Sequence, residues 1–191
     1  MSIKNFKFCG KLLGQGQPAF ILAEVGFNHN GDVELAKRMI ESAANNGADA
    51  VKLQTFIAKE MVSNSLMADD PDNSGNEIPF YEFFQRYELS RSDYAILFAH
   101  AKKINIPLFS TPFDEGSLEM LVEFGVPAIK IASPDLTYLP LLKKVAKTSL
   151  PVVLSTGMGN EEEISQALEI LQPECPIILL HCVSNYPSQY D

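Results

Sequence analysis

A carboxylate ends one of the most apolar stretches of the sequence. Residues 20–23 read F-I-L-A, and Glu24 follows them directly, ahead of V-G-F-N-H-N-G-D. Asparagine and glycine tolerate positive φ, and Asp32 can cap a following helix, so turn chemistry accounts for most of this loop. It does not account for Glu24, because a charged side chain at the end of an apolar strand needs a partner or a task. Glu24 is therefore a candidate functional residue.

Two lysines lie inside other apolar runs. In V-K-L-Q, residues 51–54, the period of two along a strand turns the apolar residues toward covering helices, so Lys52 and Gln54 point to the opposite face. The same alternation in I-K-I turns Lys130 away from its isoleucine neighbours. The alternative is a purely structural role, in which each lysine pairs with an interior carboxylate or extends its ammonium group to the rim of the barrel. Because lysine is rarely buried without a purpose, we predict that both lysines serve a function.

Small hydroxyl residues follow several of the apolar runs. They stand in F-S-T-P-F, K-I-A-S-P, L-S-T-G-M-G and C-V-S-N-Y-P, as Thr111, Ser133, Ser155 and Ser184. Ammonium groups supply charge to a phosphate or carboxylate, and hydroxyls and loop amides supply directional hydrogen bonds. One such hydroxyl alone would be a turn former, but four beside two inward lysines indicate an anion site.

The histidines and cysteines give weaker signals. His29 and His181 fall at strand ends and could bind a metal, but without a paired H-x-x-x-H a hydrogen-bonded structural imidazole is the simpler interpretation. Cys9, Cys175 and Cys182 show no C-x-x-C spacing, which disfavours a disulfide framework and a structural zinc site.

Composition narrows the class of protein. The chain has 191 residues, 46% of them apolar, and a formal net charge of −9. This charge argues against nucleic acid as a partner, because nucleic acid requires a basic face. The apolar runs are far shorter than the roughly 18 residues of a membrane span, and M-S-I-K-N-F-K-F lacks the apolar core of a signal peptide. We therefore expect a cytoplasmic protein without membrane association.

The elements that must position these residues alternate along the chain. Strands are predicted to end near residues 24, 54, 111, 133, 156 and 182, and helices are predicted over 33–46, 92–104, 117–124, 139–147 and 161–171. Ser90 and Asp114 are plausible caps, and Asn160 with Glu163 fits a capping box. Residues 55–89 interrupt the pattern with a polar insert and a short aromatic helix. Alternating strands and helices imply βαβ units and a parallel sheet.

Two parallel architectures compete, an open doubly wound sheet and a (β/α)₈ barrel. The G-x-G-x-x-G of a dinucleotide-binding sheet is absent after the first strand, whereas polar residues stand at the end of every strand, as in a barrel. We therefore predict a TIM-type barrel with about six of its eight βα units. The expected division is a hairpin or plug over 1–19 and an incomplete catalytic barrel over 20–191, with the first and sixth strands left as unpaired edges.

The motifs in this order resemble the sialic acid synthase family, which includes N-acetylneuraminate, legionaminate and pseudaminate synthases. They are F-I-L-A-E-V-G-F-N-H-N-G-D, G-A-D-A-V-K-L-Q-T-F, F-S-T-P-F-D, K-I-A-S, L-S-T-G-M-G and L-H-C-V-S-N-Y-P. Each motif alone is weak, but six in register are specific. The resemblance implies condensation of phosphoenolpyruvate with an N-acetylated hexosamine, such as N-acetylmannosamine or a diacetamido sugar, to give a nine-carbon 2-keto sugar acid and phosphate.

The resemblance also implies roles for residues. Glu24 is expected to be the catalytic acid or base, and Gln54 and Tyr186 to contact the acceptor sugar. Six residues are expected to hold phosphoenolpyruvate: Lys52, Thr111, Lys130, Ser133, Ser155 and Ser184. The family further implies a divalent metal, typically Mn²⁺, with ligands expected beyond residue 191, a C-terminal antifreeze-like domain absent from this chain, and a homodimer in the full-length form.

Three other functions stay open at this point. The closest is another phosphoenolpyruvate-dependent aldose condensation that makes eight- or seven-carbon keto acids. A Schiff-base aldolase would use Lys52 or Lys130 as the nucleophile. A truncated, non-enzymatic ligand-binding remnant is disfavoured by the intact set of anion-site residues.

Overall fold

Six parallel strands form the central sheet of the protein. A computed structural model describes residues 5–70, 72 and 75–185. The sheet order is β10-β9-β8-β7-β4-β3, which is the order of the strands along the chain without any reversal. A doubly wound sheet reverses its strand order, whereas a barrel does not, so this order confirms the predicted incomplete (β/α)₈ barrel. The strands are β3 (Leu22–Gly26), β4 (Ala50–Thr55), β7 (Leu108–Pro112), β8 (Ile129–Ile131), β9 (Val152–Ser155) and β10 (Ile177–Leu180).

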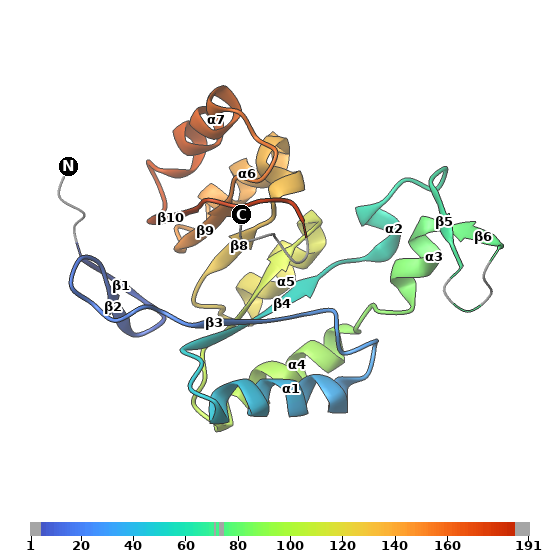
Figure 1. The fold of residues 1–191 in the computed structure, drawn as a ribbon, viewed down its shortest axis with the longest axis horizontal. Coiled ribbons are helices and arrows are strands. Elements are labelled where there is room, and N and C mark those ends of the chain that lie inside the picture. Colours follow the sequence, from blue (N-terminus) through green and yellow to red (C-terminus); the bar gives the residue numbers. More distant parts are fainter. Residues whose placement is uncertain (1–4, 71, 73–74, 186–191) are drawn as a thin grey trace.

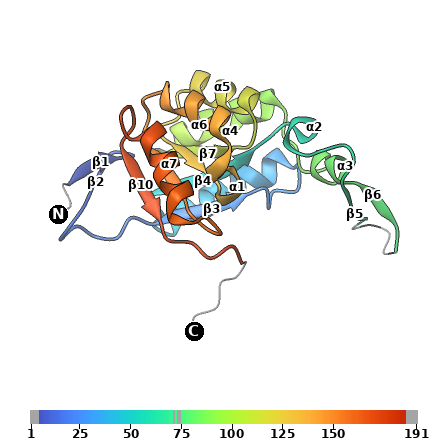
Figure 2. The same ribbon diagram turned by 90° about the horizontal axis from the view of Figure 1, so that it is seen from above.

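Helices connect the strands and cover one face of the curled sheet (Figure 2). They are α1 (Val33–Asn45), α4 (Arg91–Lys103), α5 (Glu115–Glu123), α6 (Leu139–Ala146) and α7 (Glu161–Leu171), and all five confirm the predicted helices within a few residues. The side chains of Ser90 and Asp114 cap α4 and α5, and Asn160 with Glu163 forms the predicted capping box. No helix within the described residues is long and apolar enough to cross a membrane.

A two-stranded hairpin lies where the barrel strands begin (Figure 1). It consists of β1 (Phe6–Phe8) and β2 (Lys11–Leu13), which pair antiparallel. Phe8 is buried and packs edge-on against Phe20 and Phe109. Lys11 also forms an ion pair with Asp49 just before β4. The hairpin therefore closes the amino-terminal end of the sheet, opposite the strand ends that carry the candidate site.

The insert after β4 is more structured than its polar sequence suggested. It contains α2 (Ala58–Met61), the antiparallel pair β5 (Met67–Asp69) and β6 (Glu77–Pro79), and α3 (Phe80–Gln85). Only the aromatic helix was expected. Phe27 of the loop after β3 packs against Phe56, Phe84 and Tyr87, so aromatic contacts join the insert to the loop that follows Glu24.

Within the described residues, β3 and β10 each pair with one strand of the sheet only. This agrees with the expected edges on the first and sixth barrel strands. The core lies mainly between the sheet and its helices, with Ile129, Leu142 and Leu154 among its fully buried side chains.

Candidate active site

Lys52 and Glu24 meet on the inner face of β3 and β4. They are opposite each other in the parallel register, and the Lys52 ammonium forms an ion pair with the Glu24 carboxylate. Lys52 Nζ also lies 3.3 Å from Thr111 Oγ1 on β7. The Lys52 side chain is 5% exposed and that of Glu24 is 48% exposed, so the carboxylate covers a buried cation from the open side. Burial lowers the pKa of Lys52, and the neighbouring Glu24 charge opposes this effect.

A bulge in β3 orients Glu24. The register against β4 shifts between Glu24 and Gly26, and Gly26 has a φ of 56°. A Cβ at this position would lie 3.2 Å from Glu24 Oε1 and 3.7 Å from Gln54 Cδ. Bulges beside active sites commonly redirect a side chain, and here only glycine combines the positive φ with the close approach.

Lys130 is the second buried cation of the site. It is 8% exposed, and its Nζ donates to Ser155 Oγ at 2.5 Å and to the Ile131 carbonyl oxygen at 2.6 Å. Burial, and then the nearby Lys52 charge, lower the pKa of Lys130 to about 8. An ammonium group has three donors, so each lysine keeps at least one N–H beyond the partners found within the described residues. Both lysines can therefore donate to a bound anion.

Two further serines converge at the turn after β9. Ser133 begins the 3-10 helix η1 (Ser133–Thr137), and its Oγ accepts a 3.1 Å hydrogen bond from the Gly157 N–H. A Cβ at Gly157 would lie 2.4 Å from Ser184 Oγ and 2.9 Å from Ser133 Oγ. Ser133 lies two residues beyond the end of β8 and Ser184 four residues beyond the end of β10, so both hydroxyls follow their strands closely without being part of them. The lack of a side chain at Gly157 allows them to approach.

Of the two predicted sugar contacts, the structure describes Gln54. Gln54 is on β4, opposite Thr111 in the register. Its backbone carbonyl oxygen accepts a 2.8 Å hydrogen bond from the Tyr94 hydroxyl of α4. The side chain of Gln54 lies beside Glu24 at the bulge. Tyr186 lies outside the described residues.

Asp135 is a candidate site residue that the sequence reasoning missed. It is on η1, and its Oδ2 is buried without a hydrogen-bond partner in the described part of the chain. Burial raises the pKa of Asp135 to about 6, while the Lys130 charge acts in the opposite direction. The signal was present in the sequence, because Asp135 follows the end of an apolar strand closely, as Glu24 ends one.

The histidines do not form a metal centre with these residues. His29 is 1% exposed, and its Nδ1 accepts a hydrogen bond from the Gly31 N–H at 3.2 Å, whereas His181 is exposed beyond β10. Across residues 5–70, 72 and 75–185, no three His, Cys, Asp or Glu side chains are grouped so that they could hold a metal ion. The described residues therefore contain no ligand set for a metal, and the ligands that the resemblance implied were expected beyond residue 191.

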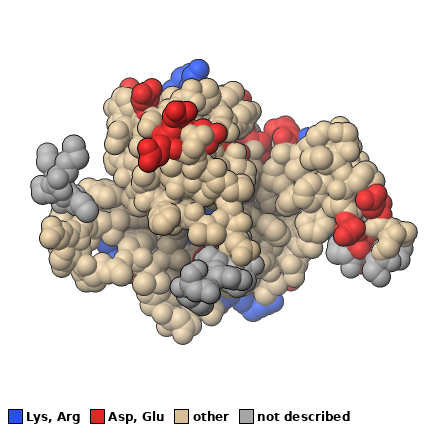
Figure 3. All heavy atoms as spheres, turned by 45° about the horizontal axis from the view of Figure 1, so that its top comes forward, with Lys and Arg blue, Asp and Glu red and all other residues tan. Residues whose placement is uncertain are grey.

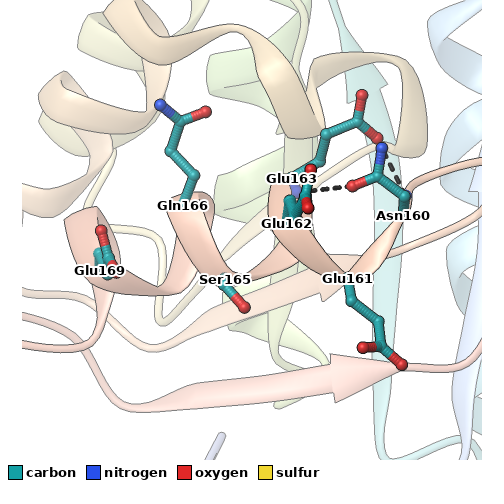
Figure 4. Close-up of a pocket in the computed structure, with 7 residues that line it drawn as sticks. All are labelled: Asn160, Glu161, Glu162, Glu163, Ser165, Gln166 and Glu169. Carbon is teal, nitrogen blue, oxygen red and sulfur yellow. Dashed lines mark hydrogen bonds between the residues drawn. The ribbon is translucent and has the colours of Figure 1, made fainter.

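A shallow pocket on α7 is a poorer candidate for an anion site (Figure 4). Its lining residues are Asn160, Glu161, Glu162, Glu163, Ser165, Gln166 and Glu169. Four carboxylates and no cation would repel an anion. Figure 3 shows the same acidic character, with Asp and Glu atoms gathered over the part of the molecule that contains α7. The cations that an anionic ligand needs are concentrated at Lys52 and Lys130 instead.

Fold and site together define a class: an incomplete (β/α)₈ barrel with two buried lysines, Lys52 and Lys130, on the inner face of its sheet. The model of the NeuB family matches residues 39–191, and the chain belongs to this family. The family match confirms the resemblance seen in the sequence motifs.

Named relatives agree with this assignment. The N,N'-diacetyllegionaminic acid synthase of Campylobacter jejuni is 42% identical over 177 residues, covering 90% of this chain and 53% of that protein. The enzyme of the same name from Legionella pneumophila is 38% identical over 185 residues, covering 93% and 52%. A crystal structure of N-acetylneuraminic acid (sialic acid) synthetase from Leptospira borgpetersenii matches with a TM-score of 0.87 and 34% identity, covering 99% of this chain and 63% of that one. The chain thus spans about half the length of the two legionaminic acid synthases.

Proposed function

We propose that the protein catalyses carbon–carbon bond formation between phosphoenolpyruvate and the open-chain aldehyde of an acetamido sugar, releasing phosphate and a 2-keto sugar acid of the sialic acid type. The observation that carries the proposal is the convergence of Lys52 and Lys130, both more than 90% buried, in a protein whose net charge is −9. The relatives named as legionaminic and sialic acid synthases support the same class of reaction.

The anion site suits phosphoenolpyruvate in charge and in hydrogen-bonding geometry. The substrate carries a phosphate and a carboxylate, and the two ammonium groups supply charge while the hydroxyls of Thr111, Ser133 and Ser155 supply directional contacts. Ser184 approaches Ser133 over Gly157 and extends the polar surface. The sialic acid synthetase from L. borgpetersenii was crystallised in complex with citrate, another small polyanion.

Glu24 is the residue best placed to transfer a proton. In the proposed reaction carbon 3 of phosphoenolpyruvate attacks the aldehyde carbon, water adds at carbon 2, and phosphate leaves. The aldehyde oxygen gains a proton and the attacking water loses one, and a carboxylate at the mouth of the site can perform either transfer. Gln54 lies beside Glu24, and in the proposed reaction it would hydrogen-bond the acceptor sugar.

The metal and the dimer that the resemblance implied, and the cytoplasmic location expected from the sequence, are part of the proposal for the whole protein. Relatives of this kind suggest a divalent metal that would act as a Lewis acid, but the described residues provide no ligand set, and we assign no step to a metal. Within the proposed reaction, this chain binds phosphoenolpyruvate and supplies the residue that acts as acid or base.

Lys130 favours one alternative chemistry. Its pKa of about 8 leaves a fraction of the amine neutral near physiological pH, as a Schiff-base aldolase requires. Borohydride in the presence of pyruvate would reduce an imine on Lys130 to a stable adduct, visible by mass spectrometry. The proposed condensation predicts no adduct with pyruvate, because in it Lys130 is a protonated ligand of the substrate anion and forms no imine.

The proposed function is tested by phosphate release from phosphoenolpyruvate. Incubation of the full-length protein with a panel of N-acetylated and diacetamido hexosamines, with and without Mn²⁺, should release phosphate with at least one sugar and yield a 2-keto acid detectable by mass spectrometry. Aldoses without acetamido groups serve as the control for the rival condensations. Phosphate release with only those aldoses would contradict the sugar class, and release with neither set would contradict the reaction.

Anion affinity should fall as pH rises through about 8. The protonated form of Lys130 attracts the substrate, and its lowered pKa means that the charge is present below about pH 8 and lost above it. Phosphate groups have a second pKa of about 6, so the substrate itself is fully ionised from about pH 7.5 upward. Titration calorimetry with phosphoenolpyruvate between pH 7.5 and 9.5 should show affinity decreasing up to about tenfold per pH unit above 8. Lys130→Arg, which keeps its charge, should flatten this dependence.

A further inference from the structure

Glu24 occupies the position on Lys52 that an anionic ligand would take. The carboxylate pairs directly with the ammonium group, and this is the one ion pair found for Glu24 within the described residues. Lys52 is otherwise enclosed, with Thr111 Oγ1 at 3.3 Å and only 4% of the residue exposed. A ligand that reaches Lys52 must therefore approach it beside, or in place of, the half-exposed carboxylate.

Electrostatic repulsion favours a ligand anion that replaces the Glu24 carboxylate on Lys52 over one that binds beside it. A phosphoenolpyruvate anion on Lys52 would place two to three negative charges next to a carboxylate, and at close range in a partly buried site this repulsion is worth kilocalories per mole. Glu24 is free to move away, because its side chain is about half exposed, whereas Lys52 is held by the surrounding strands. Displacing the flexible, solvated partner costs less than moving the buried one.

We propose that Glu24 and the anionic substrate compete for Lys52, with Gly26 as the positioning residue that directs Glu24 onto Lys52 in the free protein. The inference rests on the proposed function, since it takes the anion site as given. Binding of the substrate anion then frees the carboxylate from its cation, so Glu24 becomes available for proton transfer only when the site is loaded. Without an anion the carboxylate stays neutralised by Lys52.

Gly26 sets this competition through the bulge in β3. A Cβ at position 26 would press on Glu24 Oε1 from 3.2 Å and approach Gln54 Cδ at 3.7 Å. Side chains are also disfavoured at the observed φ of 56°. Any residue larger than glycine should therefore strain the bulge and shift the carboxylate by a few tenths of an ångström, which weakens its ion pair with Lys52 without touching the lysine itself.

The competition makes an unusual prediction for Glu24→Gln. Calorimetric titration with phosphoenolpyruvate, and separately with inorganic phosphate, should show binding about 3- to 10-fold tighter than in the unaltered protein, because an ion pair with one buried and one exposed partner no longer has to be broken. Glu34→Gln is the matched control. Glu34 also pairs with a lysine, Lys37 at 2.9 Å, but it lies on the outer helix α1, so this variant should bind both anions as the unaltered protein does.

Gly26→Ala tests the positioning role. It should tighten anion binding in the same direction and lower kcat, and the double variant with Glu24→Gln should bind no more tightly than Glu24→Gln alone, because both changes act on one contact. If circular dichroism shows that Gly26→Ala does not fold, the Glu24→Gln titration decides alone. Unchanged or weaker binding in Glu24→Gln would overturn the competition, since it would mean that Glu24 holds Lys52 in place for the ligand. If the unaltered protein binds neither anion, the proposed function itself fails, and the competition fails with it.

Discussion

Glu24→Gln should turn over about 10² to 10⁴ times more slowly than the unaltered protein while it still folds and saturates with phosphoenolpyruvate. Loss of a general acid or base typically costs this much in rate. The amide keeps the size of the side chain and can still hydrogen-bond, so the loss reports proton transfer and not packing. The measurement is kcat for phosphate release with saturating substrates, together with the Michaelis constant for phosphoenolpyruvate.

Glu34→Gln again provides the control, since it removes an exposed carboxylate of the outer helix α1 whose ion pair is with Lys37 of the same helix. Its kcat should match that of the unaltered protein. A Glu24→Gln variant with near-normal turnover would show that Glu24 contributes only charge or structure, and the acid–base role would pass to another carboxyl group. Asp135, which is buried close enough to Lys130 for the lysine charge to affect its pKa, would be the first to examine.

Lys52→Met and Lys130→Met should each raise the Michaelis constant for phosphoenolpyruvate about 10- to 150-fold, with a much smaller effect on that for the sugar. Each change removes a charge-assisted hydrogen bond, worth about 1.5 to 3 kcal/mol, from a buried site. Methionine roughly preserves the apolar stem of lysine, which limits the effect on packing. Lys52→Met also leaves Glu24 without its cation, so its kcat should change more than that of Lys130→Met.

Lys37→Met is the matched control for both variants, because Lys37 is on α1 and its partner is Glu34. Steady-state kinetics at pH 7.5, where Lys130 is largely protonated, keeps the comparison on one charge state. An unchanged constant for phosphoenolpyruvate in both site variants would refute the anion site, even if the protein proved to be an active synthase by other means.

Much of the fold followed from local signals in the sequence. Hydrophobic periodicity and caps such as Ser90 and Asn160 predicted the five barrel helices, because these signals act within a few residues of one another. The insert was less predictable. Its strands β5 and β6 have only three residues each, and they form because Met67–Asp69 and Glu77–Pro79 pair with each other and because α3 packs on the aromatic residues of another loop. Neither the pairing nor the packing has a local signature.

The candidate site was also predictable in part from local signals and in part not. Strand alternation alone predicted that Lys52 and Lys130 point inward, because successive side chains along a strand point to opposite faces of the sheet. Three features of the site depend on strand register and on the course of the loops: Lys52 pairs with Glu24, Lys130 contacts Ser155, and Ser133 and Ser184 both lie over Gly157. The residues of these pairs are separated by 25 to 51 positions in the sequence. The sequence by itself determined the kinds of group in the site and the strands that bear them. The tertiary structure decided which groups touch, because a contact between distant residues depends on how the strands pair and on where bulges such as the one at Gly26 redirect a side chain.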